Sequence, residues 1–158
     1  MYCVDTNIYL DWSIRRYPED LFPTFTRNVE DLIVAGKWKA PKQVEVEIQH
    51  VGDPNLKNWV KNQRKQFVPH DAKLMTEANA VIRDYPGLLD FHARHDEADR
   101  YVIALAKLNN WIVVTHETPA RSKKHAIRSH YIPDVCKSMN IKCIDLLGLM
   151  RLEKWMFK

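Results

Sequence analysis

The chain has 158 residues, of which 46% are hydrophobic and 28% are charged, with 24 Lys and Arg against 20 Asp and Glu. A chain of this length and composition buries enough surface to fold as a soluble globular protein without disulfides. No stretch approaches the roughly 18 consecutive apolar residues of a membrane span, and the first residues carry an acid at Asp5 and no basic leader. The three cysteines form no CxxC pair, which favours reduced thiols in a cytoplasmic protein. We therefore expect a single domain over residues 1–158.

The elements expected in the first half alternate between short strands and helices. Apolar residues recur at helical spacing from Phe25 until Gly36, and Gly52-Asp53-Pro54 interrupts a later helix. The predicted elements are a strand at 2–4, a helical turn at 7–13, a helix at about 25–35, a short strand at 38–40 and a helix at 44–51.

The second half contains the clearest helix and the clearest strand. A helix begins near Asp96 and Asp99, and the continuous apolar run at 111–115 is typical of a strand that is buried on both faces of a parallel sheet. The predicted elements are helices at about 55–66, 71–84 and 96–108, the strand at 111–115, an edge strand at 141–144 and a closing helix at 146–156. This alternation predicts an α/β protein with right-handed crossovers, in which sites form beyond the carboxyl ends of strands.

Positive charge is concentrated in two parts of the chain. Residues 121–158 carry nine basic and three acidic residues, whereas residues 1–120 carry 15 basic and 17 acidic, and the stretch 57–65 has four cations and no acid. Such asymmetry favours a polyanionic partner, although a solvated helix face explains either stretch alone equally well. The predicted nucleic-acid contacts are Lys57, Lys61, Lys65, Arg121, Lys123, Lys124 and Arg128.

Four acidic residues stand where a functional carboxylate is expected, and each also has a simpler explanation. Asp5 ends the first strand but could cap the helical turn after it, and Asp99 could form a capping box with Asp96. Glu47 lies beside the apolar side of its helix, and Glu117 lies two residues past the buried strand, so either could be solvated.

Taken together, these residues resemble the PIN-domain family of nucleases, particularly the prokaryotic toxins of the VapC type. The resemblance covers nearly the whole chain and rests on the opening Val4-Asp5-Thr6-Asn7, Glu47, Asp99 before Ile103-Ala104-Leu105-Ala106, and a strand ending in Val-Val-Thr with an acid two positions later. The segment Ile132-Pro133-Asp134-Val135-Cys136 is also similar to a hallmark of a PIN subfamily known as a domain of unknown function.

The resemblance implies a PIN-like three-layer α/β/α sandwich with a short central parallel sheet of about four or five strands. It implies that Asp5, Glu47, Asp99 and Glu117 form a catalytic acidic pocket, with Asp5, Asp99 and Glu117 as metal ligands and with Thr6, Asn7 and Thr115 in support. An antitoxin partner and a homodimer are also implied. The family usually has Asp at the position of Glu117, so this longer side chain would ligate either directly or through water.

The chemistry of the residues supports the same grouping. Clustered carboxylates repel one another unless a cation neutralises them, and oxygen ligands without a Cys or His cluster favour Mg²⁺ or Mn²⁺. The resemblance implies that such a site hydrolyses RNA phosphodiester bonds as an endoribonuclease, and one or two bound ions would orient the water and polarise the scissile phosphate. The main alternative is a PIN-like module that binds RNA without cutting it. An aspartyl-phosphate enzyme is disfavoured because Asn7 stands where its second Asp would be, and a glycosidase leaves the basic stretches unexplained.

Overall fold

A parallel sheet of five short strands forms the centre of the molecule. The structure is a computed structural model that describes residues 1–90 and 96–157. The strand order is β3-β2-β1-β4-β5, and Cys3 of the central strand pairs with Lys39 on one side and with Val113 on the other. The strands are β1 (Tyr2–Val4), β2 (Trp38–Pro41), β3 (Phe67–Val68), β4 (Ile112–Val114) and β5 (Cys143–Ile144).

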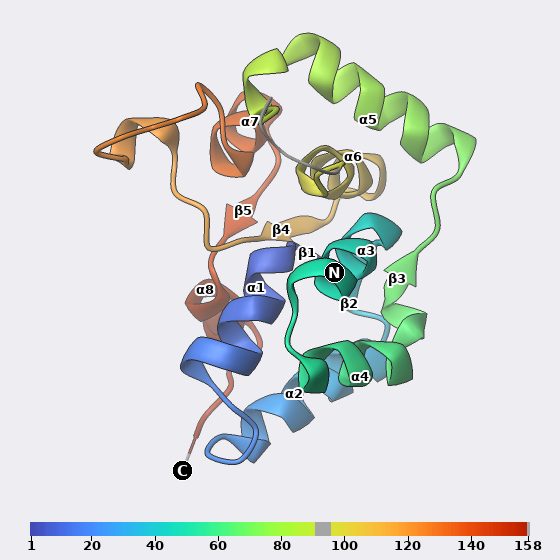
Figure 1. Cartoon of the computed structure of the whole chain (residues 1–158), viewed down its shortest axis with the longest axis vertical. Helices are drawn as coiled ribbons and strands as arrows, with labels where there is room; N and C mark the ends of the chain where they lie inside the picture. Colours follow the sequence, from blue (N-terminus) through green and yellow to red (C-terminus); the bar gives the residue numbers. More distant parts are fainter. Residues whose placement is uncertain (91–95, 158) are drawn as a thin grey trace.

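Helices cover both faces of this sheet. Figure 1 shows α5, α6 and α7 on one side of it and α1, α2 and α8 on the other. The predicted three-layer α/β/α architecture is therefore confirmed, including the position of β5 at an edge. The α-helices are α1 (Thr6–Leu10), α2 (Pro23–Val34), α3 (Lys42–Val51), α4 (Pro54–Asn62), α5 (Ala72–Asp84), α6 (Asp99–Asn109), α7 (Ile132–Ser138) and α8 (Leu146–Leu152).

Shorter helical turns complete the chain. After α1 the backbone continues as the π-helical turn η1 (Asp11–Arg16). Later in the chain, the described residues include the 3₁₀ turns η2 (Arg64–Gln66), η3 (Pro86–Leu88) and η4 (Ala120–Ser122). Among residues 1–90 and 96–157, no helix has the length and apolar character needed to cross a membrane.

Helix α6 is the most deeply buried helix and carries one predicted site residue at its first position. Six consecutive residues from Tyr101 to Ala106 are buried, because the sheet, α5 and α7 surround the helix. The predicted capping box between Asp96 and Asp99 is wrong. Ala98 holds the N-cap position without a side-chain hydrogen bond, and the Asp96 carboxylate instead accepts a hydrogen bond of 2.8 Å from Arg100.

Three short elements, β3, α7 and α8, differ from what the sequence predicted. The helix expected at 55–66 ends at Asn62, after which η2 and β3 follow, and β3 pairs with β2. Helix α7 was not predicted, and α8 ends at Leu152 rather than near 156 because Lys154 adopts a left-handed conformation with φ 57°. Two to seven residues are too few for hydrophobic periodicity, so tertiary contacts determine these elements.

Candidate active site

The four predicted acidic residues line a single pocket of about 270 Å³. Asp5 follows β1, Glu47 lies on α3, Asp99 begins α6, and Glu117 lies three residues past β4. Strands β1 and β4 are parallel neighbours, so their carboxyl ends deliver Asp5 and Glu117 to the same edge of the sheet. Residues from four separate elements are thus brought together here.

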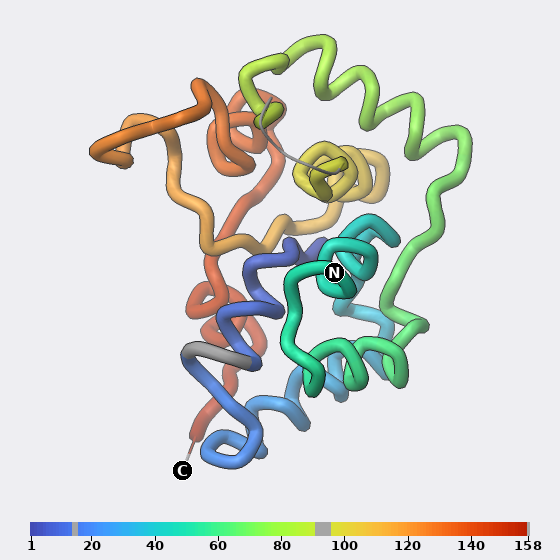
Figure 2. Tube along the Cα trace, in the orientation of Figure 1, coloured from blue at the N-terminus to red at the C-terminus, as the bar shows by residue number. Residues whose placement is uncertain are grey.

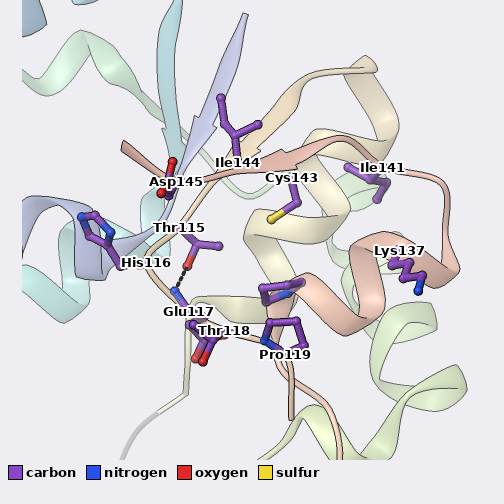
Figure 3. Close-up of a pocket in the computed structure, with 11 residues that line it drawn as sticks. Thr115, His116, Glu117, Thr118, Pro119, Lys137, Ile141, Cys143, Ile144 and Asp145 are labelled. Atoms are coloured by element: carbon purple, nitrogen blue, oxygen red, sulfur yellow. Dashed lines mark hydrogen bonds between the residues drawn. The ribbon is translucent and has the colours of Figure 1, made fainter. Parts of the chain in front are cut away.

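The Thr115 hydroxyl fixes the orientation of Asp5. It donates to Asp5 Oδ2 over 2.7 Å and accepts from Asn7 Nδ2 at 3.1 Å and from the Glu117 amide at 3.0 Å, the last of which is drawn in Figure 3. Because a hydroxyl has one proton, these three bonds leave it a single orientation. The other oxygen, Asp5 Oδ1, accepts from the Thr6 amide at 2.7 Å, so Asp5 caps α1 as well as lining the pocket.

Glu47 on α3 forms hydrogen bonds to α1 and to the start of α6, which the alternative of a solvated side chain did not predict. Its Oε2 accepts a hydrogen bond from the Thr6 hydroxyl on α1, and its Oε1 accepts one of 2.7 Å from the Ala98 amide immediately before α6. Asn7 adds a second tie, because its Oδ1 accepts from the His116 amide at 2.9 Å. All three predicted supporting residues, Thr6, Asn7 and Thr115, therefore contact the acidic residues or the loop that carries Glu117.

Glu117 also points into the pocket. Its Oε2 accepts from the Ile132 amide at the start of α7 over 2.9 Å, and its Oε1 lies 3.2 Å from Arg128 Nη2. The Glu117 side chain is 15% exposed, which overturns the alternative of a loop carboxylate in free solvent.

Two further charged residues belong to the pocket and were not assigned to it from the sequence. Arg128 Nη1 lies 3.0 Å from Asp99 Oδ2 and 3.4 Å from Glu97 Oε1, and it donates to the Leu88 carbonyl at 2.9 Å. Arg128, which was predicted as a nucleic-acid contact, thus lies inside the acidic pocket, where its side chain is 12% exposed and contacts carboxylates. Glu97 lies two residues before Asp99, on the segment that leads into α6. Its closeness to Asp99 in the sequence is the signal that could have assigned it to the pocket.

Comparison with known proteins places this chain in a family. The model of the family described as a domain of unknown function (DUF4411) matches residues 2–157. The chain belongs to the DUF4411 family. This agrees with the expectation drawn from the Ile132–Cys136 segment, whereas the VapC type stays a prediction.

A solved structure supports the fold of this DUF4411 chain. The crystal structure of FitAcB from Neisseria gonorrhoeae matches it with a TM-score of 0.50 and 15% sequence identity, over 91% of this chain and 96% of that one. At this identity the likeness shows the PIN-like fold alone. The comparison with curated proteins finds no match.

Burial and the charges of neighbouring acids raise the pKa values of Asp5, Asp99 and Glu117. Burial raises the pKa of Asp5 to about 8, with the charges of Glu117 and Glu47 adding to the rise and the Thr115 hydrogen bond opposing it. Burial and the charges of Glu117 and Asp5 likewise hold the pKa of Asp99 well above its usual range. Burial also raises the pKa of Glu117, against the Ile132 amide and Arg128. These DUF4411 carboxyls therefore need more positive charge than Arg128 supplies.

The donor chemistry fits a hard divalent cation, since every acid in the pocket offers carboxylate oxygens, and burial and neighbouring charges raise the pKa values of Asp5 and Asp99. The arrangement is not that of a preformed metal site. Within the described part of the chain, no three His, Cys, Asp or Glu side chains form a metal-binding group. The guanidinium of Arg128 instead contacts Asp99 and Glu117, two of the three predicted ligands.

The remaining predicted cations lie on two separate parts of the surface. Lys57 and Lys61 belong to α4, with Lys65 in η2, while Arg121, Lys123 and Lys124 lie on the segment between β4 and α7. Figure 1 shows α4 and this segment far apart across the molecule, and Figure 2 traces the segment as a long orange excursion from the sheet. Lys123 packs 4.1 Å from the centre of the Tyr131 ring.

Proposed function

We propose that this protein is a divalent-metal-dependent endoribonuclease and the toxin component of a toxin–antitoxin pair. The observation that carries the proposal is the convergence of five carboxyl groups on one pocket beyond the carboxyl ends of β1 and β4. A structural role does not require so many carboxyl groups at one pocket, and acids with perturbed pKa values, such as Asp5, Asp99 and Glu117, gather at functional sites. The five are Asp5, Glu47, Glu97, Asp99 and Glu117.

Asp5, Asp99 and Glu117 would hold Mg²⁺ or Mn²⁺. When bound, such an ion polarises the scissile phosphate and acidifies a water at neutral pH. Asp5 is suited to this role because Thr115 and the Thr6 amide hold its carboxylate in one orientation. This preorganisation means that the Asp5 side chain is already ordered when the substrate arrives.

Glu47 is best suited to positioning. Both of its oxygens accept hydrogen bonds, from the Thr6 hydroxyl and from the Ala98 amide. A carboxylate held in this way fixes the start of α1 relative to the start of α6, and so fixes Asp5 relative to Asp99. The proposal also gives Glu47 the orientation of the attacking water.

The RNA substrate is supported by charge, and the protein partners by resemblance. Arg121 and Lys124 are exposed on the segment that carries Arg128, so their charges can attract the phosphates that flank the cleaved bond. The antitoxin partner and the homodimer follow from the likeness to PIN-domain toxins, and they form part of the same proposal.

A second candidate is an RNA-binding module that does not cut. The position of Arg128 favours it, because the guanidinium neutralises Asp99 and Glu117 directly. If Arg128 were a permanent counter-ion, the pocket would bind no metal and the basic segment alone would hold RNA.

The deciding experiment incubates purified protein with total RNA in Mg²⁺, in Mn²⁺ and in EDTA. We expect cleavage with metal only, and a loss of several orders of magnitude in Asp5→Asn and Asp99→Asn. Asp96→Asn is the matched control, since this carboxylate is three residues from Asp99 but bonds to Arg100 outside the pocket. RNA binding without cleavage under any of these conditions would select the binding module.

A further inference from the structure

A second hollow adjoins the acidic pocket at the carboxyl ends of β4 and β5. Its volume is about 570 Å³, and it shares Glu117 with the acidic pocket, while Thr115 lines it and bonds to Asp5. Figure 3 shows the hollow with Thr115 and Glu117 side by side at its edge. A ligand held here would therefore lie next to any phosphate bound at Asp5 and Asp99.

Apolar side chains form two sides of the hollow, and polar residues line the rest, namely Thr115, His116, Glu117, Thr118, Lys137 and Asp145. Pro119 and Pro133 line one side, and Ile141, Cys143 and Ile144 line another. In Figure 3 the Cys143 sulfur points toward the interior, with Pro119 across from it. The volume falls within the roughly 300–1,000 Å³ of small-molecule sites, and apolar walls suit the face of a nucleobase.

A cation stands at the rim of the hollow. Lys137, near the end of α7, is exposed and forms no salt bridge among the residues that the structure describes. The hollow continues past Lys137 into another of about 450 Å³, which shares Pro119, Pro133 and Lys137 and adds the exposed Arg121. The acidic pocket, the apolar hollow, Lys137 and Arg121 therefore form one continuous surface.

We propose that this hollow binds the nucleoside adjacent to the cleaved phosphodiester, with Lys137 contacting the next phosphate along the RNA. The inference deepens the proposed nuclease function and rests on it. The predicted path of the RNA includes some of the cations and leaves others out. Lys137 and Arg121 lie on the path that leads from the acidic residues, whereas Lys57 and Lys61 of α4 line neither hollow.

The first test needs no variant. Mononucleotides (5′-AMP and 5′-UMP) are added to isotope-labelled protein in EDTA, and backbone amide shifts are recorded. We expect concentration-dependent shifts at residues 115–118, 137 and 143–145, and none at 57–65. Shifts confined to α4, or absent throughout, would overturn the proposal.

The second test measures binding of a ten-nucleotide single-stranded RNA in EDTA. We expect Lys137→Gln to weaken binding at least about threefold and to reduce the slope of log affinity against log salt by about 0.7, the value for one phosphate contact on a single strand. Lys142→Gln is the charge-matched control, because Lys142 is also exposed but does not line the hollow.

The outcomes separate this inference from the proposed function. Equal affinities for Lys137→Gln and Lys142→Gln would remove the nucleoside site even if the protein cleaves RNA. Mononucleotide shifts in the hollow of a protein that cleaves no RNA would support the nucleoside site and remove the nuclease. Shifts produced by a peptide in place of nucleotides would make the hollow a protein-binding surface and overturn the proposal.

Discussion

At the scale of single residues, Arg128 is the basic side chain among the described residues that line the acidic pocket. Its Nε is buried and finds no hydrogen-bond partner in the part of the chain that the structure describes. Burial lowers the pKa of Arg128, but the charges of Asp99, Glu117 and Glu97 outweigh this and raise it. Its Nη1 and Nη2 atoms contact the Leu88 carbonyl, Glu97, Asp99 and Glu117, so the guanidinium stands where the proposed metal ion would compete for the same carboxylates.

Replacing Arg128 tests this competition directly. We expect Arg128→Gln to bind Mn²⁺ more tightly by calorimetry, since two carboxylates lose their counter-ion, and to melt at a lower temperature without metal. Arg121→Gln removes the same charge from the exposed part of the segment and should change neither property. Weaker metal binding in Arg128→Gln would mean that the guanidinium supports the site.

Asp5 is expected to make the stability of the metal-free protein depend on pH. Its pKa is about 8 in the folded state, whereas an unfolded Asp titrates near ~3.9. The folded state therefore binds more protons between these values, so the free energy of unfolding falls as pH rises from about 4 to about 8. Denaturant unfolding in EDTA at pH 5 and pH 8 should show this fall, and Asp5→Asn should lessen it. If both proteins showed the same pH dependence, the pKa of Asp5 would not be raised in the folded state.

At the scale of elements, the ends of β1 and β4 are joined by Thr115. Its hydroxyl contacts Asp5, Asn7 and the Glu117 amide, so one side chain connects the strand end, α1 and the loop after β4. The charged groups therefore depend on an uncharged residue for their placement.

Removing this hydroxyl should affect stability and activity together. Thr115→Val leaves buried polar groups of Asp5 and Asn7 unpaired and should lower the free energy of unfolding by about 1–3 kcal/mol. We expect RNA cleavage and Mn²⁺ affinity to fall as well, and Thr115→Ser to restore both. If Thr115→Val loses stability but cleaves at the wild-type rate, the hydroxyl is structural only.

At the scale of the whole molecule, the two basic stretches lie on different parts of the surface. The stretch between β4 and α7 is continuous with the acidic pocket through the hollows at Pro119, whereas α4 lies across the molecule from it (Figure 1). We therefore expect a short RNA that occupies the acidic pocket to follow the first of them.

The length of the RNA should distinguish the two stretches. For a ten-nucleotide RNA, neutralising Arg121, Lys123 and Lys124 should flatten the slope of log affinity against log salt by about 0.7 for each phosphate that these cations bind. Neutralising Lys57, Lys61 and Lys65 should leave that slope unchanged and affect only much longer RNA. An equal effect of both triple variants on the short RNA would show that α4 contributes to its path.

The sequence alone determined four of the five strands of the sheet, namely β1, β2, β4 and β5, and the positions of the four predicted acids. Apolar runs defined β1, β2 and β4, and parallel pairing places Asp5 and Glu117 at one edge because both follow carboxyl ends. These are local patterns, and each is readable within a few residues.

Only the tertiary structure decided how the acidic residues are compensated and supported. Arg128 reaches Asp99 across 29 residues, Thr115 reaches Asp5 across 110, and Glu47 reaches the Ala98 amide across 51. In the sequence, Arg128 cannot be distinguished from the other cations of its basic stretch, and only the structure places its side chain in the acidic pocket. The position of Lys137 beside the hollow likewise depends on residues from other elements. Contacts over such separations depend on how the helices pack around the sheet. Hydrophobic periodicity and residue type predict the elements but do not predict which individual side chains will meet.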